Sequence, residues 1–159
     1  MDKHRPMDLG AIARTIIDAN TYMTLGTADG EGRPWVSPVY YAAAEYREFF
    51  WVSSPEATHS RNISARPQIS IVIFDSQAPI GAGQAVYMSA VAHELTGADR
   101  GLGIEVFSRA SVANGARPWT LDDVVAPSLL RLYRATASEH SVLDPAARPD
   151  RRTLVNVTS

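Results

Sequence analysis

The sequence contains no cysteine, which excludes disulfide bonds and thiolate metal sites. No apolar run approaches the roughly 20 residues that a membrane-spanning helix needs. Residues 1–8 are polar and charged, and they lack the apolar centre of a signal peptide. We therefore expect a soluble, cytoplasmic protein, a compartment with which the lack of cysteine is compatible.

An excess of charge of either sign is also missing. The 15 Lys and Arg residues are nearly balanced by 17 Asp and Glu residues, so the chain has no electrostatic footprint for nucleic acid. The four histidines do not form the close pair on a helix that is typical of zinc sites. Neither a dinucleotide-binding glycine fingerprint nor a Gly-x-Ser-x-Gly elbow is present. The sequence therefore gives no reason to assign a metal ligand or a catalytic residue.

Hydrophobic periodicity predicts a few helices around many short strands. Helices are expected at 8–19 and 99–111, with Asp8 capping the first and Asn20 ending it in a left-handed conformation, and one helical turn at 121–125. Strands are expected at 22–28, 35–44, 49–52, 68–75, 85–95 and 129–143.

Most of these strands are joined by short turns, without the regular strand–helix alternation of a doubly wound sheet. We therefore predict a mostly β (α+β) fold, a six-stranded antiparallel barrel with peripheral helices. At 159 residues the chain is long enough for one domain with a full core. We place this domain at residues 1–145 and a C-terminal tail, rich in Pro and Arg, at 146–159.

The most informative stretch is 49–74, where a polar segment separates two apolar strands. We take Ser54 as the N-cap of a helix and Pro55 as its first residue, since proline has no N–H to leave unsatisfied there. The helix should end near Ala65, because Pro67 disfavours helical geometry at the residue before it. The N–H groups of the first helical turn are a favourable place for an anion.

Polar side chains near this predicted helix start add to that preference. His59 and Arg61 supply potential positive charge, and Ser53 and Thr58 supply hydroxyl donors. Each residue taken alone is explained equally well by helix capping or by an ordinary exposed surface. Together, directly after a buried strand, they favour a binding site for a phosphate group and hence for a small-molecule cofactor.

The order of these segments resembles the pyridoxamine 5'-phosphate oxidase-like family, also called the FMN-binding split-barrel proteins. The segments that carry the resemblance are 22–27 (YMTLGT), 32–41 (GRPWVSPVYY), 50–54 (FWVSS), 58–63 (THSRNI), Pro67 and the strand at 69–74. The resemblance covers roughly residues 8–143. It implies a six-stranded split barrel, a homodimer, and FMN in a groove between the subunits.

The resemblance also implies which residues bind the cofactor. Segment 36–39 would lie along the flavin ring and offer backbone groups, and the two serines after the third strand would approach the ribityl chain and the phosphate. His59 takes the place of the more usual Lys or Arg, although histidine is only partly charged near neutral pH. Gln84 is a candidate from the partner chain. The full set is Val36, Ser37, Pro38, Val39, Ser53, Ser54, Thr58, His59, Arg61, Asn62 and Gln84.

By this resemblance the protein is expected to be an FMN-dependent oxidoreductase acting on a small molecule. The C-terminal region lacks the tryptophan-plus-arginine end with which true pyridoxamine phosphate oxidases recognise their substrate, so a different substrate is expected. A deazaflavin in place of FMN is one alternative. A non-catalytic flavin- or haem-binding protein and a cofactor-free interaction module are the others.

Overall fold

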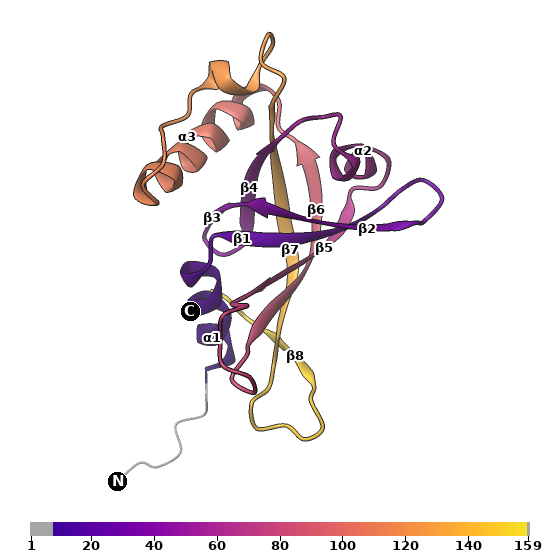
Figure 1. The fold of residues 1–159 in the computed structure, drawn as a ribbon, viewed down its shortest axis with the longest axis vertical. Coiled ribbons are helices and arrows are strands. Elements are labelled where there is room, and N and C mark those ends of the chain that lie inside the picture. Colours follow the sequence, from indigo (N-terminus) through magenta and orange to yellow (C-terminus); the bar gives the residue numbers. More distant parts are fainter. Residues whose placement is uncertain (1–7, 159) are drawn as a thin grey trace.

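The structure, a computed structural model, describes residues 8–158. Residues 1–7 and Ser159 lie outside the described residues. They include most of the polar N-terminal segment, residues 1–8, noted in the sequence. An antiparallel sheet of eight strands curls into a barrel, with three α-helices packed around it (Figure 1). The predicted antiparallel split barrel with peripheral helices is confirmed, although the sheet has eight strands instead of six.

Most elements lie close to their predicted positions. The strands are β1 (Tyr22–Ala28), β2 (Pro34–Tyr40), β3 (Ala42–Ala44), β4 (Glu48–Ser53), β5 (Gln68–Phe74), β6 (Ala85–Glu94), β7 (Arg131–Leu143) and β8 (Arg152–Val155). The helices are α1 (Leu9–Ala19), α2 (Thr58–Ala65) and α3 (Gly97–Ala113), with a 3₁₀ turn η1 (Leu121–Val124). No helix among residues 8–158 is both long and apolar enough to cross a membrane.

The order of strands in the sheet explains why the barrel closes and why it stays split. The order is β2-β1-β5-β6-β7-β4-β3, and β8 pairs with β7. Only Tyr41 separates β2 from β3 in the chain, so the two ends of the sheet are held beside each other and the sheet has to curl. Within the described chain no backbone pairing joins β2 to β4, so the barrel is open between these two strands. We call this opening the split.

Tyr41 accounts for one of the two extra strands. The sequence predicts a single strand at 35–44, but the structure breaks it at this residue. The Tyr41 N–H donates to the Thr21 carbonyl over 3.2 Å, and its buried hydroxyl donates to the Ile17 carbonyl over 2.6 Å. These bonds turn the chain toward α1, so Ala42–Ala44 pairs with β4 instead of continuing beside β1.

The C-terminal segment accounts for the other extra strand. Residues 152–155, within the predicted tail at 146–159, form β8 on β7, and Val157 is buried in the core. At the opposite terminus Asp8 caps α1 as predicted, since its Oδ1 accepts from the Ala11 N–H over 3.1 Å. Asn20 does not adopt the predicted left-handed conformation. Its φ is −111°, and its side-chain amide donates to the Ile16 carbonyl instead.

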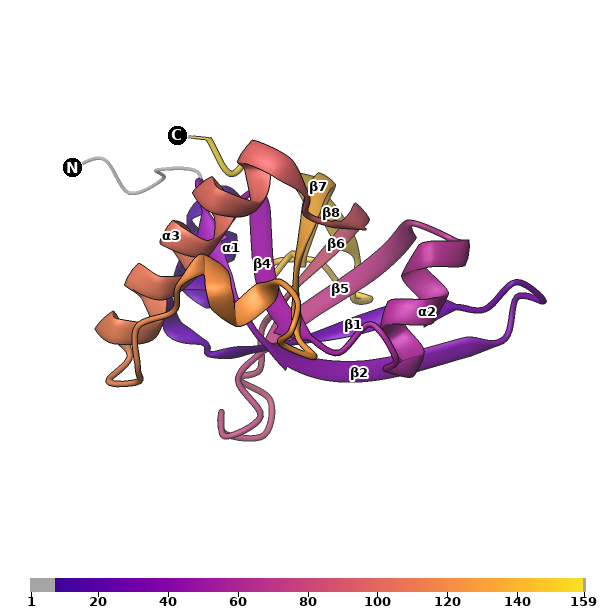
Figure 2. The same ribbon diagram turned by 90° about the horizontal axis from the view of Figure 1, so that it is seen from above.

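The core fills the barrel with side chains from alternate strand positions. In β5, for example, Ile69, Ile71 and Ile73 are buried, whereas the residues between them face outward. The helices occupy different parts of the outside. Helix α3 packs against β3, β4 and β7, and α2 lies beside β1 and β2 at the split (Figure 2).

Candidate functional site

The free edge of β2 borders the split. Because β2 stands at the end of the sheet order, only its β1 side is paired in this chain. In an antiparallel pair about half of the backbone N–H and C=O groups point away from the partner strand, so part of the backbone of 36–39 faces the open edge. The side chains of this segment differ: Val36 is 71% exposed, Ser37 is half-buried and Val39 belongs to the core.

Across the split, β4 ends at Ser53 and a turn leads into α2. The Ala57 N–H donates to the Ser54 carbonyl over 3.1 Å, and the Glu56 N–H donates to the Ser54 hydroxyl over 3.1 Å. The prediction that Ser54 caps the helix and Pro55 opens it is therefore wrong, because Ser54 closes a separate turn and α2 begins only at Thr58. The predicted end near Ala65 agrees with the structure.

The start of α2 has backbone donors to spare. Its N-cap residue is Ala57, which has no side-chain acceptor for the N–H groups of the first turn. Thr58, at the first helical position, is exposed. The eight-residue helix thus presents uncapped N–H groups and a hydroxyl where its dipole attracts negative charge.

Ser53 and His59 connect the end of β4 to α2. The Ser53 Oγ and His59 Nε2 atoms lie 2.8 Å apart, within hydrogen-bond distance. Burial of the half-buried imidazole lowers the pKa of His59 below its ordinary value of 6.5. The imidazole is therefore neutral near pH 7 in the free protein, and this position holds no permanent cation.

Arg61 lies on the outer side of α2. Its guanidinium forms an ion pair with the Glu56 carboxylate, and both side chains are largely exposed. Exposed ion pairs of this kind contribute little to stability. The arginine is thus held near the helix start without being committed to the protein core.

Asn62 has a different environment from the other predicted site residues. It is only 5% exposed, and its Nδ2 donates to Thr27 Oγ1 over 3.0 Å. The Thr27 hydroxyl in turn donates to the Trp35 carbonyl over 3.4 Å. Asn62 therefore fixes α2 against β1 and β2. Thr27 was missed by the sequence analysis, although it is a polar residue in the inward-facing series that begins with Met23 and Leu25.

Gln84 lies away from this cluster. It precedes β6 at the end of the β5–β6 pair opposite to α2, where its Nε2 donates to the Leu143 carbonyl over 3.4 Å and its buried Oε1 has no hydrogen-bond partner. Within one chain, the structure thus gathers the predicted residues of the β4–α2 junction and sets segment 36–39 across the split from them. It does not bring Gln84 to the same place.

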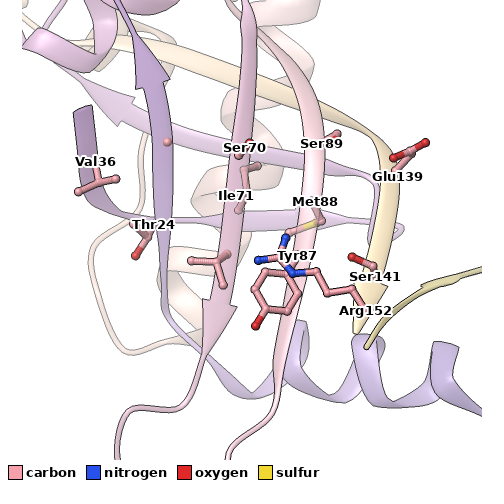
Figure 3. Close-up of a pocket in the computed structure, with 12 residues that line it drawn as sticks. Thr24, Val36, Ser70, Ile71, Tyr87, Met88, Ser89, Glu139, Ser141 and Arg152 are labelled. Atoms are coloured by element: carbon pink, nitrogen blue, oxygen red, sulfur yellow. The ribbon is translucent and has the colours of Figure 1, made fainter. Parts of the chain in front are cut away.

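The outer face of the sheet carries a separate cavity of about 500 Å³ (Figure 3). It is lined by Thr24, Gly26, Val36, Ser70, Ile71, Val72, Tyr87, Met88, Ser89, Glu139, Ser141 and Arg152. Val36 is the one predicted site residue among them. The signal that sequence reasoning missed is one outward-facing serine in each of two neighbouring strands, Ser70 in β5 and Ser89 in β6, which pair with each other.

Comparisons with known proteins place this geometry in a wider group. The chain has the same fold as a heme-binding protein from Mycobacterium smegmatis, with 24% identity and a TM-score of 0.73 over 95% of this chain and 59% of that one. The heme storage protein HutZ from Vibrio cholerae has 22% identity and a TM-score of 0.63, over 83% and 92% of the two chains. A FAD-binding protein from Mesorhizobium loti has 20% identity and a TM-score of 0.61, over 83% and 91%.

The chain spans 59% of the length of the Mycobacterium smegmatis protein. No curated protein matches the chain in sequence. The family model described as pyridoxamine 5'-phosphate oxidase matches residues 11–152, from within α1 to the first residue of β8. A match over nearly the whole split barrel decides the assignment: the chain belongs to the pyridoxamine 5'-phosphate oxidase family.

Proposed function

We propose that this protein is a flavin-dependent oxidoreductase that binds FMN along the split between β2 and β4 and acts on a small molecule. The observation that carries the proposal is the Ser53–His59 hydrogen bond of 2.8 Å beside the uncapped start of α2. It places a hydroxyl, an imidazole and free backbone N–H groups together at one end of the split. Membership of the family supports the choice of a flavin.

The donors at the β4–α2 junction fit a phosphate monoester. A phosphate dianion needs several hydrogen-bond donors, and Ser53, Thr58, His59 and the first N–H groups of α2 can supply them. A bound dianion would also raise the pKa of His59, because the nearby negative charge favours the imidazolium. Arg61 adds a charge that can turn from Glu56 toward the phosphate, since an exposed ion pair is easily exchanged.

The free edge of β2 fits the polar rim of a flavin ring. Backbone N–H and C=O groups of 36–39 would hydrogen-bond to the ring, and Asn62 would act indirectly by fixing α2 against β1 and β2. FMN, when bound, supplies the hydride and electron transfer itself. The protein's part in this proposal is to bind and orient the cofactor and to keep water from one of its faces.

We further propose that the protein is a homodimer. Large apolar side chains lie exposed on the outer face of the sheet, including Tyr22 at 63%, Val36 at 71% and Phe74 at 50%. A second copy on this face would remove them from water. In such a dimer the partner's Gln84 is the candidate for the flavin site, since Gln84 lies away from the β4–α2 junction of its own chain. Size-exclusion chromatography with light scattering tests this, because a mass near 17.3 kDa would rule out the dimer.

The absorption spectrum of freshly purified protein, followed by titration with FMN, tests the cofactor. The proposal predicts a flavin spectrum, or saturable binding of one FMN per chain. A protein that is colourless and does not bind added FMN would contradict it. Comparison with a deazaflavin by fluorescence quenching tests the nearest alternative. A Soret band would instead support haem, which is named for two of the proteins of the same fold.

Binding alone does not make an enzyme, so turnover needs its own test. Reduced nicotinamide with an electron acceptor should be consumed by the FMN-loaded protein faster than by free FMN. Equal rates would support a flavin carrier without catalytic activity.

A further inference from the structure

The cavity on the outer face of the sheet contains a guanidinium that is held in place but not paired. Arg152 stands at the start of β8, and its guanidinium carbon lies 3.6 Å from the centre of the Tyr87 ring (Figure 3). This cation–π contact orients the arginine over β6. None of the ion pairs found among residues 8–158 involves Arg152. The planar fork of N–H donors is therefore available to a carboxylate.

A carboxylate lines the same cavity at a different point. Glu139 is exposed on β7, and it too takes part in no ion pair within the described part of the chain. Figure 3 shows Glu139 next to Ser89, away from Arg152, which reaches over Tyr87. The cavity thus has one cationic end and one anionic end.

The strand register places the two ends of the cavity over different positions of the sheet. Tyr87 pairs with Ser141, and Ser89 pairs with Glu139. The two pairs are two residues apart along the strands, which corresponds to roughly 7 Å at about 3.3 Å per residue. This is a spacing of backbone positions, because Arg152 itself belongs to β8 and pairs with Leu143. A zwitterion can offer its carboxylate to the guanidinium and its ammonium group to the Glu139 carboxylate, with a charge-assisted hydrogen bond at each end.

The rest of the lining suits the same kind of molecule. Thr24, Ser70, Ser89 and Ser141 offer hydroxyls that both donate and accept, and Val36 and the Tyr87 ring offer apolar surface. A cavity of about 500 Å³ lies within the range of small-molecule sites. We propose that this cavity is a second binding site, for a small zwitterion such as an α-amino acid, with its carboxylate on Arg152 and its ammonium group on Glu139.

This site is distinct from the proposed flavin site, with which it shares only Val36 among the candidate residues. A second subunit on the outer face would close the cavity and hold the zwitterion between the subunits. Because the two sites share only Val36, binding of the zwitterion and binding of FMN can be measured separately, and either proposal can fail without the other.

Three compounds that differ only in their charged groups test the site. The purified protein is titrated with L-phenylalanine, L-phenylalaninamide and 3-phenylpropionate, and backbone amide shifts are followed by NMR spectroscopy. L-phenylalaninamide lacks the carboxylate, and 3-phenylpropionate lacks the ammonium group. We expect L-phenylalanine to bind about tenfold more tightly than either, as expected for loss of one charge-assisted hydrogen bond. The shifts should centre on Tyr87 and Ser141.

Two variants assign the ends of the ligand. Arg152→Gln should abolish the preference for L-phenylalanine over its amide, and Glu139→Gln should abolish the preference over 3-phenylpropionate. Both side chains are exposed, so the variants should fold, which circular dichroism checks. The matched control is Arg151→Gln, since Arg151 is the neighbouring exposed arginine and does not line this cavity. FMN affinity should be the same in all of these proteins.

Several results would overturn the proposal. One is the absence of saturable binding up to about 20 mM, a concentration at which a millimolar site is nearly full. Another is equal affinity for the three compounds, which would mean that the site does not recognise the carboxylate and the ammonium group of the ligand. A third is an unchanged preference in Arg152→Gln, or an equal loss in Arg151→Gln.

Discussion

His59 is the residue on which the proposed phosphate site depends most. Its imidazole is neutral near pH 7 in the free protein, because burial lowers its pKa. A bound phosphate would raise that pKa, so the proposal couples FMN binding to uptake of a proton. We therefore expect FMN affinity to be highest at low pH and to fall as the pH rises through the pKa of His59 in the complex.

The size of the effect follows from the kind of hydrogen bond. A bond from a charged donor contributes about 1.5–3 kcal/mol, compared with about 0.5–1.5 kcal/mol for a neutral one. The difference of about 1.5 kcal/mol corresponds to roughly tenfold in Kd. We expect FMN to bind about tenfold more weakly at about pH 8.5 than at about pH 6.5, a range in which the phosphate is mostly a dianion.

Two substitutions separate charge from hydrogen bonding. His59→Gln keeps a donor but cannot be protonated, so its FMN affinity should be independent of pH and should match the weak limit of the natural protein. His59→Lys supplies a permanent cation, so it should bind FMN tightly at both pH values. The assay is quenching of flavin fluorescence, and riboflavin, which lacks the phosphate, is the internal control.

Arg61→Gln is the control for a general loss of positive charge. Arg61 is exposed and paired with Glu56, so its removal should weaken FMN binding by less than about threefold. The reasoning is refuted if FMN and riboflavin respond equally to pH, or if His59→Gln keeps the pH dependence. If Arg61→Gln weakened FMN binding more than His59→Gln does, the phosphate would have to be assigned to the outer side of α2.

Three further predictions concern the scaffold. Gly101→Ala should stabilise the protein by about 1 kcal/mol, because it is an interior position of α3 with open space around it. Gly103→Ala should be less stable than Gly101→Ala by about 2 kcal/mol in urea unfolding, since its Cβ would lie only 2.8–3.1 Å from three packed side chains. Equal stabilities would contradict the packing of α3. Asn62→Ala should lower the free energy of unfolding by about 1–3 kcal/mol, because it removes the buried amide that joins α2 to β1. The control Ser64→Ala, at an exposed position of the same helix, should lower it by less than about 0.5 kcal/mol. His140 is buried with its pKa lowered, mainly by burial, so the unfolded chain takes up the proton first and stability falls as the pH drops below about 6.5. His140→Gln should flatten this slope, and an unchanged slope would assign it to other groups.

Much of the fold could be predicted from local patterns. The alternating isoleucines of β5 and the helical spacing in α1 are properties of short segments, and both elements lie where the sequence places them. The two extra strands depend on distant contacts instead. Tyr41 breaks its strand because its hydroxyl reaches the Ile17 carbonyl, and β8 forms only because β7 is there to pair with it. Neither partner is visible in the local sequence.

The candidate site shows the same division. The cluster of polar residues at the β4–α2 junction is evident from the sequence, and the structure joins Ser53 to His59. The predicted start of α2 is wrong, because the hydroxyl and carbonyl of Ser54 accept hydrogen bonds within a separate turn instead of capping the helix. The cavity that contains Arg152 is lined by residues of six strands, so only the folded sheet reveals it.

The central claim is that the phosphate of a bound flavin lies against His59. The most direct measurement is the pKa of this residue by NMR spectroscopy of protein labelled with ¹⁵N in its histidine rings, with His59→Gln to assign the signal. The account predicts that FMN raises the pKa of His59, whereas riboflavin leaves it where it is in the free protein. A His59 signal that titrates identically with FMN and with riboflavin would contradict the claim.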